Sequence, residues 1–315
     1  MRNEGIFLLE WVAYHQGLGF DAIVIVTNDC TDGTDTLAAR LAATGHVIHI
    51  DQTVPPGGNP QDAGMDLALQ WLRGHGFAWA LHIDSDEFLL IDHGTGRITD
   101  LLADLSSADV VPIPWRNFGD NGQTDWTPGD NVLQRFTRAE PEPTAGVTKF
   151  KCLFRVASFL HATDHNPLFP TVTNPVVLNP DGEKLSNTTL YQRKSSRFRP
   201  HDIACRARRA RLNHYAIKSQ DLFLIKNDRG NGQGTGGRGK YQLNSRWHRI
   251  ANRNDVEDRA ILRHWPDTAA RLTALRADPE TAALETACQD WFSTRRAAFL
   301  TPDRRAELTD RKARA

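Results

Sequence analysis

Two carboxylates one residue apart follow an apolar stretch of the chain. Residues 81–88 read Leu-His-Ile-Asp-Ser-Asp-Glu-Phe, so Asp84 and Asp86 stand where a buried strand would emerge into a loop. Side chains two positions apart in an extended chain point the same way, so both carboxylates can face one ligand. Hard oxygen ligands suit Mn²⁺ or Mg²⁺, and such a cation can neutralise a diphosphate leaving group. The pattern predicts a divalent-cation site; the alternatives are a solvated turn or a helix N-cap.

The segments before this motif alternate between helix and strand patterns. Helices and strands are predicted, in chain order, over residues 5–16, 21–27, 35–44, 46–50 and 61–74. The continuous apolar run within 21–27 is typical of a strand buried on both faces of a parallel sheet. This order predicts an α/β sheet with right-handed crossovers, which binds ligands at the carboxyl ends of its strands. The polar turn 28–34 and the acidic motif both follow such ends, so together they form a candidate site.

After residue 109 the pattern is less regular. A strand over 110–115 is interrupted by Pro112 and Pro114, which predicts an edge or irregular position. Residues 116–131 are rich in Gly, Asn and Asp and predict a long functional loop. The further predictions are a strand over 149–156, irregular chain over 161–180, and helices over 202–211 and 216–227.

The last part of the chain predicts a helical appendage. Residues 228–240 contain six glycines in 13 positions and are expected to be mobile. From about residue 255 the chain reads as short amphipathic helices, with Pro266, Pro279 and Pro302 close to their starts.

Size and composition set broad limits. A chain of 315 residues predicts one or two domains, and Lys plus Arg equal Asp plus Glu at 38 each, which gives no hint of a nucleic-acid partner. The four cysteines are scattered without a C-x-x-C pair, which argues against a zinc knuckle or disulfide scaffold and fits a reducing compartment. No apolar run approaches the ~20 residues that span a bilayer, and no apolar signal segment begins the chain. We therefore expect a soluble cytoplasmic protein; peripheral contact with the inner membrane face stays open.

Several short motifs, each present once, follow one another along the chain in a characteristic order. They are Arg-Asn-Glu-Gly with Leu-Glu-Trp-Val-Ala-Tyr-His (2–15), Thr-Asn-Asp-Cys-Thr-Asp-Gly-Thr (27–34), Ile-Asp-Ser-Asp-Glu-Phe (83–88), Trp-Arg-Asn-Phe-Gly-Asp-Asn-Gly (115–122), Gln-Arg-Phe-Thr (134–137) and His-Tyr-Ala-Ile-Lys-Ser followed by Phe, Lys and Arg-Gly (214–230). Together they resemble family 2-type glycosyltransferases, and more narrowly the bacterial subgroup related to the family 92 enzymes. The resemblance implies a GT-A (Rossmann-like) mixed sheet flanked by helices over residues 1–230, with 231–315 as a C-terminal helical region. It also implies a nucleotide-sugar donor (UDP- or GDP-sugar), a glycan or glycolipid acceptor, and Mn²⁺ or Mg²⁺.

The resemblance assigns a metal site. Asp84 and Asp86 match the metal-binding Asp-x-Asp pair, and His214 matches a late histidine that completes the metal or diphosphate site. A lone histidine is more often packed or on the surface, and His165 and His161 are its rivals for this role.

The resemblance also assigns donor-binding positions, which include Asp84. Glu4 matches an acidic position that contacts the nucleoside, and Asn28 lies where relatives often place an aspartate that reads the nucleobase. Lys218 and Lys226 are candidates to meet the diphosphate.

The chain departs from the family pattern in two places. Relatives usually have an apolar first strand before the Arg-Asn-Glu turn, whereas this sequence starts at Met1. Either that strand is missing, or the start has been assigned too late. A missing strand would remove a central member of the sheet whose end shapes the nucleotide pocket. The second departure is Gln134, where relatives often have a glutamate; a glutamine cannot act as a general base.

Sugar transfer with inversion needs a carboxylate base for the acceptor hydroxyl and a cation for the leaving diphosphate. Asp120 is the first choice for the base because its Phe-Gly-Asp-Asn-Gly loop is expected to border the acceptor; the alternative is that it stabilises a turn. Glu87 is the second catalytic candidate, or else it orients the metal ligands. Asp125 and Asp130 are the other carboxylates of this region.

Two further groups have competing interpretations. Residues 193–211 hold eight Lys or Arg against Asp202 alone. They form a solvated face, or they contact an anionic substrate or lipid head groups, or they bind nucleic acid; the last is least favoured because no array of stacking aromatics accompanies them. Trp115 and Trp126 flank the polar loop and either stack on a sugar or pack beneath the loop.

The sequence thus predicts a metal-dependent, inverting GT-A glycosyltransferase. One alternative is a sugar-phosphate nucleotidyltransferase, although such enzymes usually carry a Gly-rich basic loop after the first strand. The other is a non-catalytic sugar- or nucleotide-binding scaffold of the same fold.

Overall fold

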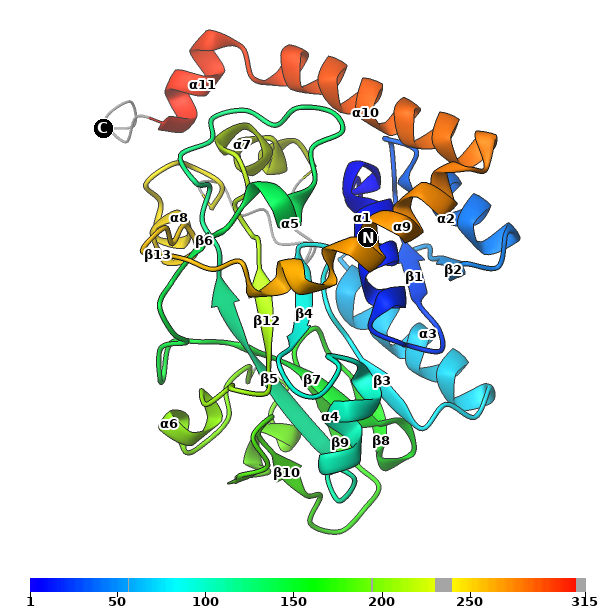
Figure 1. The fold of residues 1–315 in the computed structure, drawn as a ribbon, viewed down its shortest axis with the longest axis vertical. Coiled ribbons are helices and arrows are strands. Elements are labelled where there is room, and N and C mark those ends of the chain that lie inside the picture. The colour runs from blue at the N-terminus through cyan, green and yellow to red at the C-terminus, as the bar shows by residue number, and fades with distance from the viewer. Residues whose placement is uncertain (56, 194, 230–239, 310–315) are drawn as a thin grey trace.

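The computed structural model describes residues 1–55, 57–193, 195–229 and 240–309, and helices alternate with strands along its first part (Figure 1). The elements are α1 (Gly5–Gly17), β1 (Val24–Thr27), α2 (Thr34–Ala43), β2 (Ile48–Asp51), α3 (Pro60–Gly74), β3 (Trp79–Leu81) and β4 (Glu87–Ile91). The predicted helices and strands of this part are confirmed. The acidic motif, however, lies in the turn that joins β3 to β4, so strands lead both into it and out of it.

Local sequence explains how these elements start and how they are held. Asn59 caps α3, since its Oδ1 accepts from the Gln61 N–H at 3.0 Å, and Pro60 follows as the first helical residue. Helix α1 is buried along most of its length and pins β4: Trp11 Nε1 donates to the Glu87 carbonyl at 3.0 Å, and the Tyr14 hydroxyl donates to the Leu89 carbonyl at 2.7 Å. These bonds fix the strand that carries the end of the acidic motif.

A mixed sheet forms the centre of the molecule. The elements that follow β4 are α4 (Ile98–Asp104), β5 (Val110–Asn117), α5 (Val132–Arg135), β6 (Arg138–Ala139), β7 (Phe150–Arg155), η1 (Val156–Ser158), β8 (Phe159–Ala162), β9 (Pro167–Pro170), β10 (Val177–Leu178), β11 (Lys184–Leu185), η2 (Thr188–Tyr191), α6 (His201–Ala204), β12 (Ala210–His214) and α7 (Gln220–Arg229). Strand β7 pairs antiparallel with both β3 and β5, β5 pairs parallel with β12, and β12 pairs antiparallel with β4. The α/β prediction with a mixed, helix-flanked sheet is confirmed at this level.

Two predictions of this region are wrong. The helix predicted over 202–211 ends at Ala204, and residues 210–214 form β12, which is inserted between β4 and β5. Pairing on both sides and burial of Leu212 outweigh local propensity there. The region 161–180, predicted as irregular, contains the hairpin of β8 and β9.

Strand β5 lies inside the sheet, although its prolines predicted an edge. It pairs with β7 over Val110–Pro114 on one side; on the other side it meets β10 only at Val110 and β12 from Trp115 onward. Pro112 and Pro114 therefore fall in the gap between those two neighbours, where a missing N–H costs no ladder bond.

The C-terminal residues wrap around the sheet domain. Their elements are α8 (Arg246–Ala251), β13 (Val256–Glu257), η3 (Ala260–His264), α9 (Trp265–Arg276), α10 (Pro279–Phe299) and α11 (Pro302–Thr309). The predicted helices and their initial prolines are confirmed, while most of the glycine-rich stretch 228–240 lies outside the described residues. Helices α9 and α10 pack on α1, and α10 also packs on α2 and α7 (Figure 1).

Ion pairs hold the two ends of α10. Near its start, Asp278 accepts two hydrogen bonds from the Arg40 guanidinium of α2, at 2.7 and 2.8 Å. Towards its end, Arg296 donates to Asp221 of α7 at 2.7 Å and to the Trp126 carbonyl at 2.6 Å. The helix therefore braces the first helical layer against the loop that follows β5.

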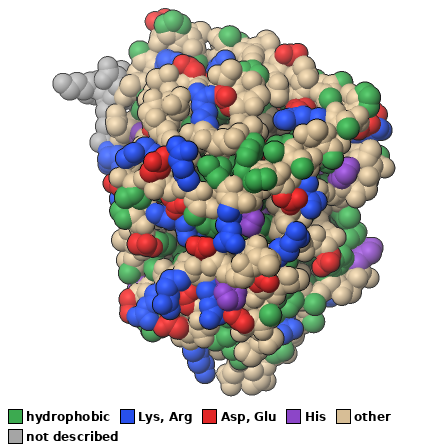
Figure 2. Space-filling model, viewed as in Figure 1, with side chains coloured by type: hydrophobic (Ala, Val, Ile, Leu, Met, Phe, Trp, Pro, Cys, Tyr) green, Lys and Arg blue, Asp and Glu red, His purple; other side chains and the backbone are tan. Residues whose placement is uncertain are grey.

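On the face of the molecule shown in Figure 2, neither charge dominates. Acidic and basic side chains are interspersed across the view in Figure 2, in keeping with the balanced composition. None of the helices among the described residues has the length and apolar character needed to cross a membrane.

Candidate functional site

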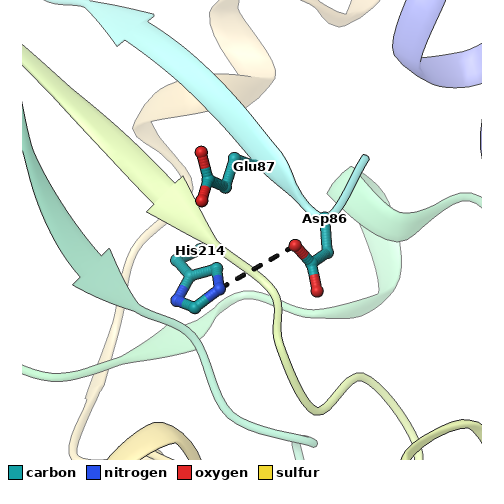
Figure 3. Close-up of side chains that lie close together, drawn as sticks. All are labelled: Asp86, Glu87 and His214. Atoms are coloured by element: carbon teal, nitrogen blue, oxygen red, sulfur yellow. Dashed lines mark ion pairs between the residues drawn. The ribbon is translucent and has the colours of Figure 1, made fainter. Parts of the chain in front are cut away.

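Three side chains with cation-binding chemistry meet where β4 begins and β12 ends. Asp86 ends the β3–β4 turn and Glu87 is the first residue of β4; His214, the last residue of β12, is the register partner of Glu87 (Figure 3). The Tyr215 N–H donates to the Asp86 carbonyl at 2.8 Å, which fixes the turn against β12. One ligand atom from each of the three lies within 4.8 Å of the others. Two carboxylates and an imidazole form a donor set for Mn²⁺ or a similar divalent ion.

The hydrogen bonds of His214 fix its tautomer. Asn117 turns its amide nitrogen to Glu140 Oε1 at 3.0 Å, so its Oδ1 faces His214 Nδ1 at 3.1 Å. An amide oxygen accepts, so Nδ1 carries the proton and Nε2 presents its lone pair to Asp86 Oδ1, 3.8 Å away. Burial lowers the pKa of His214 to about 4, despite the opposing pull of Asp86, so the ring is neutral at pH 7. This is the form of histidine that ligates metals.

Glu87 is buried and only partly satisfied. Its Oε2 accepts from the Asp84 N–H at 3.2 Å, whereas its Oε1 has no hydrogen-bond partner within the described chain and lies 3.8 Å from Lys151 Nζ. Burial raises the pKa of this carboxyl well above its usual value, and the neighbouring aspartates add to the effect. A cation near the Oε1 atom would satisfy it and favour its ionised form.

Each aspartate of the motif has its own lysine. Lys226 of α7 donates to Asp86 Oδ2 at 3.1 Å, and Lys151 of β7 donates to Asp84 Oδ2 at 2.9 Å. Burial alone would raise the pKa of both aspartates, but the adjacent lysines lower it below the ordinary range, so both are ionised. The carboxylate of Asp84 thus points to Lys151, while that of Asp86 shares its surroundings with His214.

A cavity of about 580 Å³ opens beside these groups. Asp84, Asp86, His214 and Lys226 all line it, and the rest of this end is formed by Trp115, Lys149, Asp164, His165, Lys240, Tyr241 and Trp247. The mixture of aromatic faces and lysines around two carboxylates suits a ligand with flat or ring-shaped parts and a negative charge.

Some of the residues predicted to bind the donor line the cavity, and one is buried away from it. Glu4 and Asn28 line the cavity together with Asp84. Lys218 is buried, with its ammonium 4.2 Å from the centre of the Phe7 ring. Of the two lysines predicted to meet the diphosphate, Lys226 is the one that contacts the acidic motif, through Asp86.

Of the carboxylates considered for the base, Glu87 lies at the motif, whereas Asp120, Asp125 and Asp130 are not among the residues that line the cavity. Asp120 accepts from the side-chain amides of Asn252 and Asn254, at 3.0 and 3.1 Å, and from the N–H two residues ahead at 2.9 Å. These contacts are those of the turn-stabilising alternative. Asp125 pairs with Arg305 at 3.1 Å, and Asp130 pairs with an arginine of α5. Gln134 is exposed.

The rival histidines and the two tryptophans are also placed. His165 lines the cavity and its Nδ1 donates to the Phe150 carbonyl at 2.8 Å, while His161 is exposed beside an aspartate of α3. Trp115 lines the cavity with its ring stacked on His214 at 4.0 Å, whereas Trp126 packs between aromatic rings beneath the loop. Trp115 is therefore available to a ligand, and Trp126 belongs to the core.

Sequence reasoning missed Lys151, Asp164 and Trp247. Lys151 stands between the apolar residues Phe150 and Cys152 of a strand that is buried along most of its length, where a lysine is unusual; this was the signal that could have marked it. Asp164 precedes His165 in a loop, and Trp247 comes from α8; nothing in their local sequence indicates that they meet the motif.

Comparison with known proteins gives one partial match. No family model matches the chain. Over 95 residues, which are 30% of its length, the chain is 35% identical to a glycosyltransferase family 92 protein of Ricinus communis. The matched stretch covers 16% of that protein, so the chain spans a small part of the relative it matches. The broader part of the resemblance drawn from the motifs, that to glycosyltransferases, is supported by this similarity.

Proposed function

We propose that the protein is a metal-dependent glycosyltransferase of the GT-A kind, which moves a sugar from a nucleotide-diphosphate donor to a hydroxyl acceptor with inversion. The observation that carries the proposal is the trio of Asp86, Glu87 and His214 at the edge of a cavity lined by aromatic and lysine side chains. The partial similarity to a protein named as a family 92 glycosyltransferase supports the same reaction class.

The residues present fit a divalent cation. His214 directs a lone pair at the Asp86 carboxylate, and the buried Oε1 of Glu87 has no hydrogen-bond partner in the described chain. Two acceptors that face each other across 3.8 Å repel unless a cation lies near both. Asp86, Glu87 and His214 would hold the ion, with Asp84 beside them, and a bound cation would neutralise the charge that develops on the leaving diphosphate.

The remaining residues of the cavity would hold the donor. Glu4, which precedes α1, and Asn28, which follows β1, both line the cavity and are proposed to contact the nucleoside. Lys226 lies at the motif and could exchange its bond with Asp86 for one with a phosphate oxygen. Trp115 offers a ring face to the sugar.

We assign the general base to Asp164 in place of Asp120. Asp164 lines the cavity on the side of the motif, next to Lys151 and His165. Its carboxylate would take the acceptor hydroxyl proton while the acceptor oxygen forms a bond to the anomeric carbon. The bond from that carbon to the diphosphate oxygen breaks at the same time, and the diphosphate leaves with the electron pair.

The test is calorimetric titration of UDP and of GDP with and without Mn²⁺. We expect one nucleotide to bind in the presence of Mn²⁺, and Asp86→Asn to weaken that binding by at least about tenfold, as the loss of a metal-site residue does. Asp104→Asn, which removes a carboxylate outside the cavity lining, is the matched control and should bind as the unaltered protein does. Unchanged binding by Asp86→Asn would refute the metal site.

Transfer itself is tested with the nucleotide that binds. The corresponding nucleotide sugar is incubated with Mn²⁺ and simple glycoside acceptors, and the configuration of the product is read by NMR. A β-linked product from an α-linked donor supports inversion. Tight nucleotide binding without hydrolysis or transfer would favour the binding scaffold over the enzyme.

A further inference from the structure

Some arginines of the basic run at residues 193–211 are ion-paired, and others are not. Four arginines near the end of the run pair with carboxylates at 2.5 to 3.0 Å: Arg206, Arg208, Arg209 and Arg211. Arg197 and Arg199 are exposed, and neither forms an ion pair within the described part of the chain. The end of the run is therefore an ion-paired surface, whereas these two cations have no such explanation.

Both arginines line a second cavity, of about 440 Å³. We call it the basic pocket; its lining includes Thr188, Ser195, Ser196, Arg197, Arg199 and His201. Among the described residues, it shares no lining residue with the candidate site, and none of its lining residues is acidic or apolar. A pocket that combines positive charge with hydrogen-bond donors and lacks carboxylates attracts anions.

The backbone places the two arginines on the same side of their segment. Phe198 between them is fully buried, in edge-to-face contact with a phenylalanine of β7, so its two neighbours face outward. Their carbonyls are fixed as well: that of Arg197 accepts from a threonine hydroxyl of η2 and that of Arg199 from the Ser186 N–H, both at 2.8 Å. An anchored segment loses little conformational freedom when a ligand binds, which favours binding.

The protein itself uses only part of the hydrogen-bonding capacity of the basic pocket. Arg197 Nε donates to a backbone carbonyl at 3.4 Å, whereas its terminal nitrogens and the guanidinium of Arg199 have no acceptor among the described residues. The hydroxyls of Ser195 and Ser196 have no partner there either. His201 Nδ1 donates to a backbone carbonyl at 3.0 Å, which leaves Nε2 as the ring atom that can meet a ligand.

We propose that the basic pocket binds the phosphate group of a small phosphorylated molecule. The planar fork of a guanidinium matches two phosphate oxygens, and the serine hydroxyls can donate to the others. The cavity volume falls within the range of small-molecule sites and exceeds what one phosphate ion needs, so the phosphate would carry a further group. The proposal goes beyond the transferase reaction and does not depend on it, because the two cavities are separate.

A soluble sugar phosphate and the head group of a membrane lipid both present this chemistry. Two exposed apolar side chains adjoin the lining of the pocket: Tyr191 is 54% exposed and Val147 is 50% exposed. Tyr191 ends η2, and the Val147 carbonyl accepts from Arg197 Nε. If the phosphate belonged to a lipid, these side chains would lie at the level of its head groups. The experiment separates the two sources.

The test titrates inorganic phosphate into the full chain at constant ionic strength, with backbone amides observed by NMR. We expect saturable shifts at the amides that surround the basic pocket, with a Kd below about 10 mM. Arg199→Gln should raise that Kd by at least about tenfold, because it removes charge-assisted hydrogen bonds. Arg208→Gln is the matched control: its side chain is 85% exposed and lies outside the lining, so the Kd should stay within about twofold.

Two results would overturn the site. Absence of saturable shifts up to about 50 mM phosphate would show that the pocket does not bind the ion. Equal weakening by Arg208→Gln and Arg199→Gln would show a general attraction by the basic run and no defined pocket. If Arg199→Gln does not fold, Arg197→Gln provides the same comparison.

Two further probes identify the molecule that carries the phosphate. Glucose 1-phosphate is titrated in the same way, and vesicles of phosphatidylcholine with and without phosphatidic acid are tested by co-sedimentation. Tighter binding of glucose 1-phosphate than of inorganic phosphate assigns a soluble ligand. Vesicle binding that requires phosphatidic acid and is lost in Arg199→Gln assigns a lipid. If neither probe binds, the pocket takes the free ion alone, and the proposal of a larger phosphorylated ligand is wrong.

Discussion

Removing the ammonium of Lys151 tests how the acidic motif is held. This side chain is 1% exposed, and its Nζ contacts Asp84 Oδ2 at 2.9 Å and the Asp164 carbonyl at 2.6 Å. Burial lowers the pKa of Lys151, but Asp84, Glu87 and Asp164 more than offset this and raise it above its usual value. Lys151→Met keeps the length of the chain and removes the charge, so it leaves Asp84 without its counter-ion.

Lys151→Met is expected to lower the free energy of unfolding by about 3 kcal/mol. Breaking a buried ion pair from one side costs about 3–5 kcal/mol, and the lower end applies because water reaches the side chain of Asp84, which is 33% exposed. Asp84→Asn should cost less, about 1–2 kcal/mol, because its amide oxygen still accepts from Lys151. The variant that carries both Lys151→Met and Asp84→Asn should lose less stability than the two single variants lose together. We expect this difference in the free energy of unfolding to be about 1–2 kcal/mol.

The assay is urea unfolding of the four proteins of this cycle, with Lys149→Met as the control. Lys149 stands two positions away, with its ammonium 5.7 Å from the Trp115 ring, and its removal should cost less than about 1 kcal/mol. If the loss of stability in the double variant equals the sum of the losses for Lys151→Met and Asp84→Asn to within about 0.5 kcal/mol, the two side chains do not interact and the pairing is refuted.

The same pair predicts a pH dependence. Lys151 overcomes the effect of burial and holds the pKa of Asp84 below its unfolded value, which is near 3.8. The folded state therefore takes up this proton later than the unfolded state, so the stabilisation is complete above about pH 4 and declines as the pH falls. The stability gap between the unaltered protein and Lys151→Met should narrow below that pH. A constant gap down to pH 3 would contradict the account.

Three other changes have defined outcomes. Burial raises the pKa of Glu10 from 4.5 to about 7, so unfolding releases its proton and stability should fall by about 3 kcal/mol between pH 4.5 and 7. Glu10→Gln should flatten that part of the curve in urea unfolding, and parallel curves would contradict the shift. Gly119→Ala should destabilise by about 1–3 kcal/mol, since a Cβ there would lie 2.4 Å from Asn254 Oδ1 and 2.6 Å from the Arg253 carbonyl; an unchanged Tm would show that the C-terminal residues yield easily. Asp164→Asn should abolish transfer and leave the nucleotide Kd within about twofold, and full activity would exclude Asp164 as the base.

Local signals explain why the first part of the fold could be predicted. The apolar run of β1, the Asn-Pro start of α3 and the helical spacing of α1 each act within a few residues, so sequence pattern suffices for them. Strand β12 could not be predicted in the same way. The arginines at and before its start, Arg206 to Arg211, resemble a helix surface, and only pairing with β4 and β5 makes residues 210–214 a strand.

In the candidate site, too, residues close together in the sequence could be predicted, whereas those brought together by strand pairing could not. Asp84 and Asp86 are neighbours in sequence, so their spacing alone predicted a shared turn. Asp86 and His214 meet only because β12 runs beside β4, and Lys151 reaches Asp84 only through β7. The general base had to be inferred from a loop position, and the structure places Asp120 in a turn network with Asn252.

The brace formed by α10 limits how the molecule can move. Its 21 residues, at about 1.5 Å each, make a rod about 31 Å long, anchored by Arg40 at one end and by Asp221 at the other. A rod fixed at both ends resists hinge bending between the layer that would bind the nucleotide and the loop beyond β5. In the proposed transferase, substrate entry and product release would then rely on small local rearrangements at the rim of the cavity. The turnover rate of the proposed enzyme would then depend on how fast side chains and loops at the cavity rearrange. Rigid-body motion between the two regions that α10 connects would contribute little.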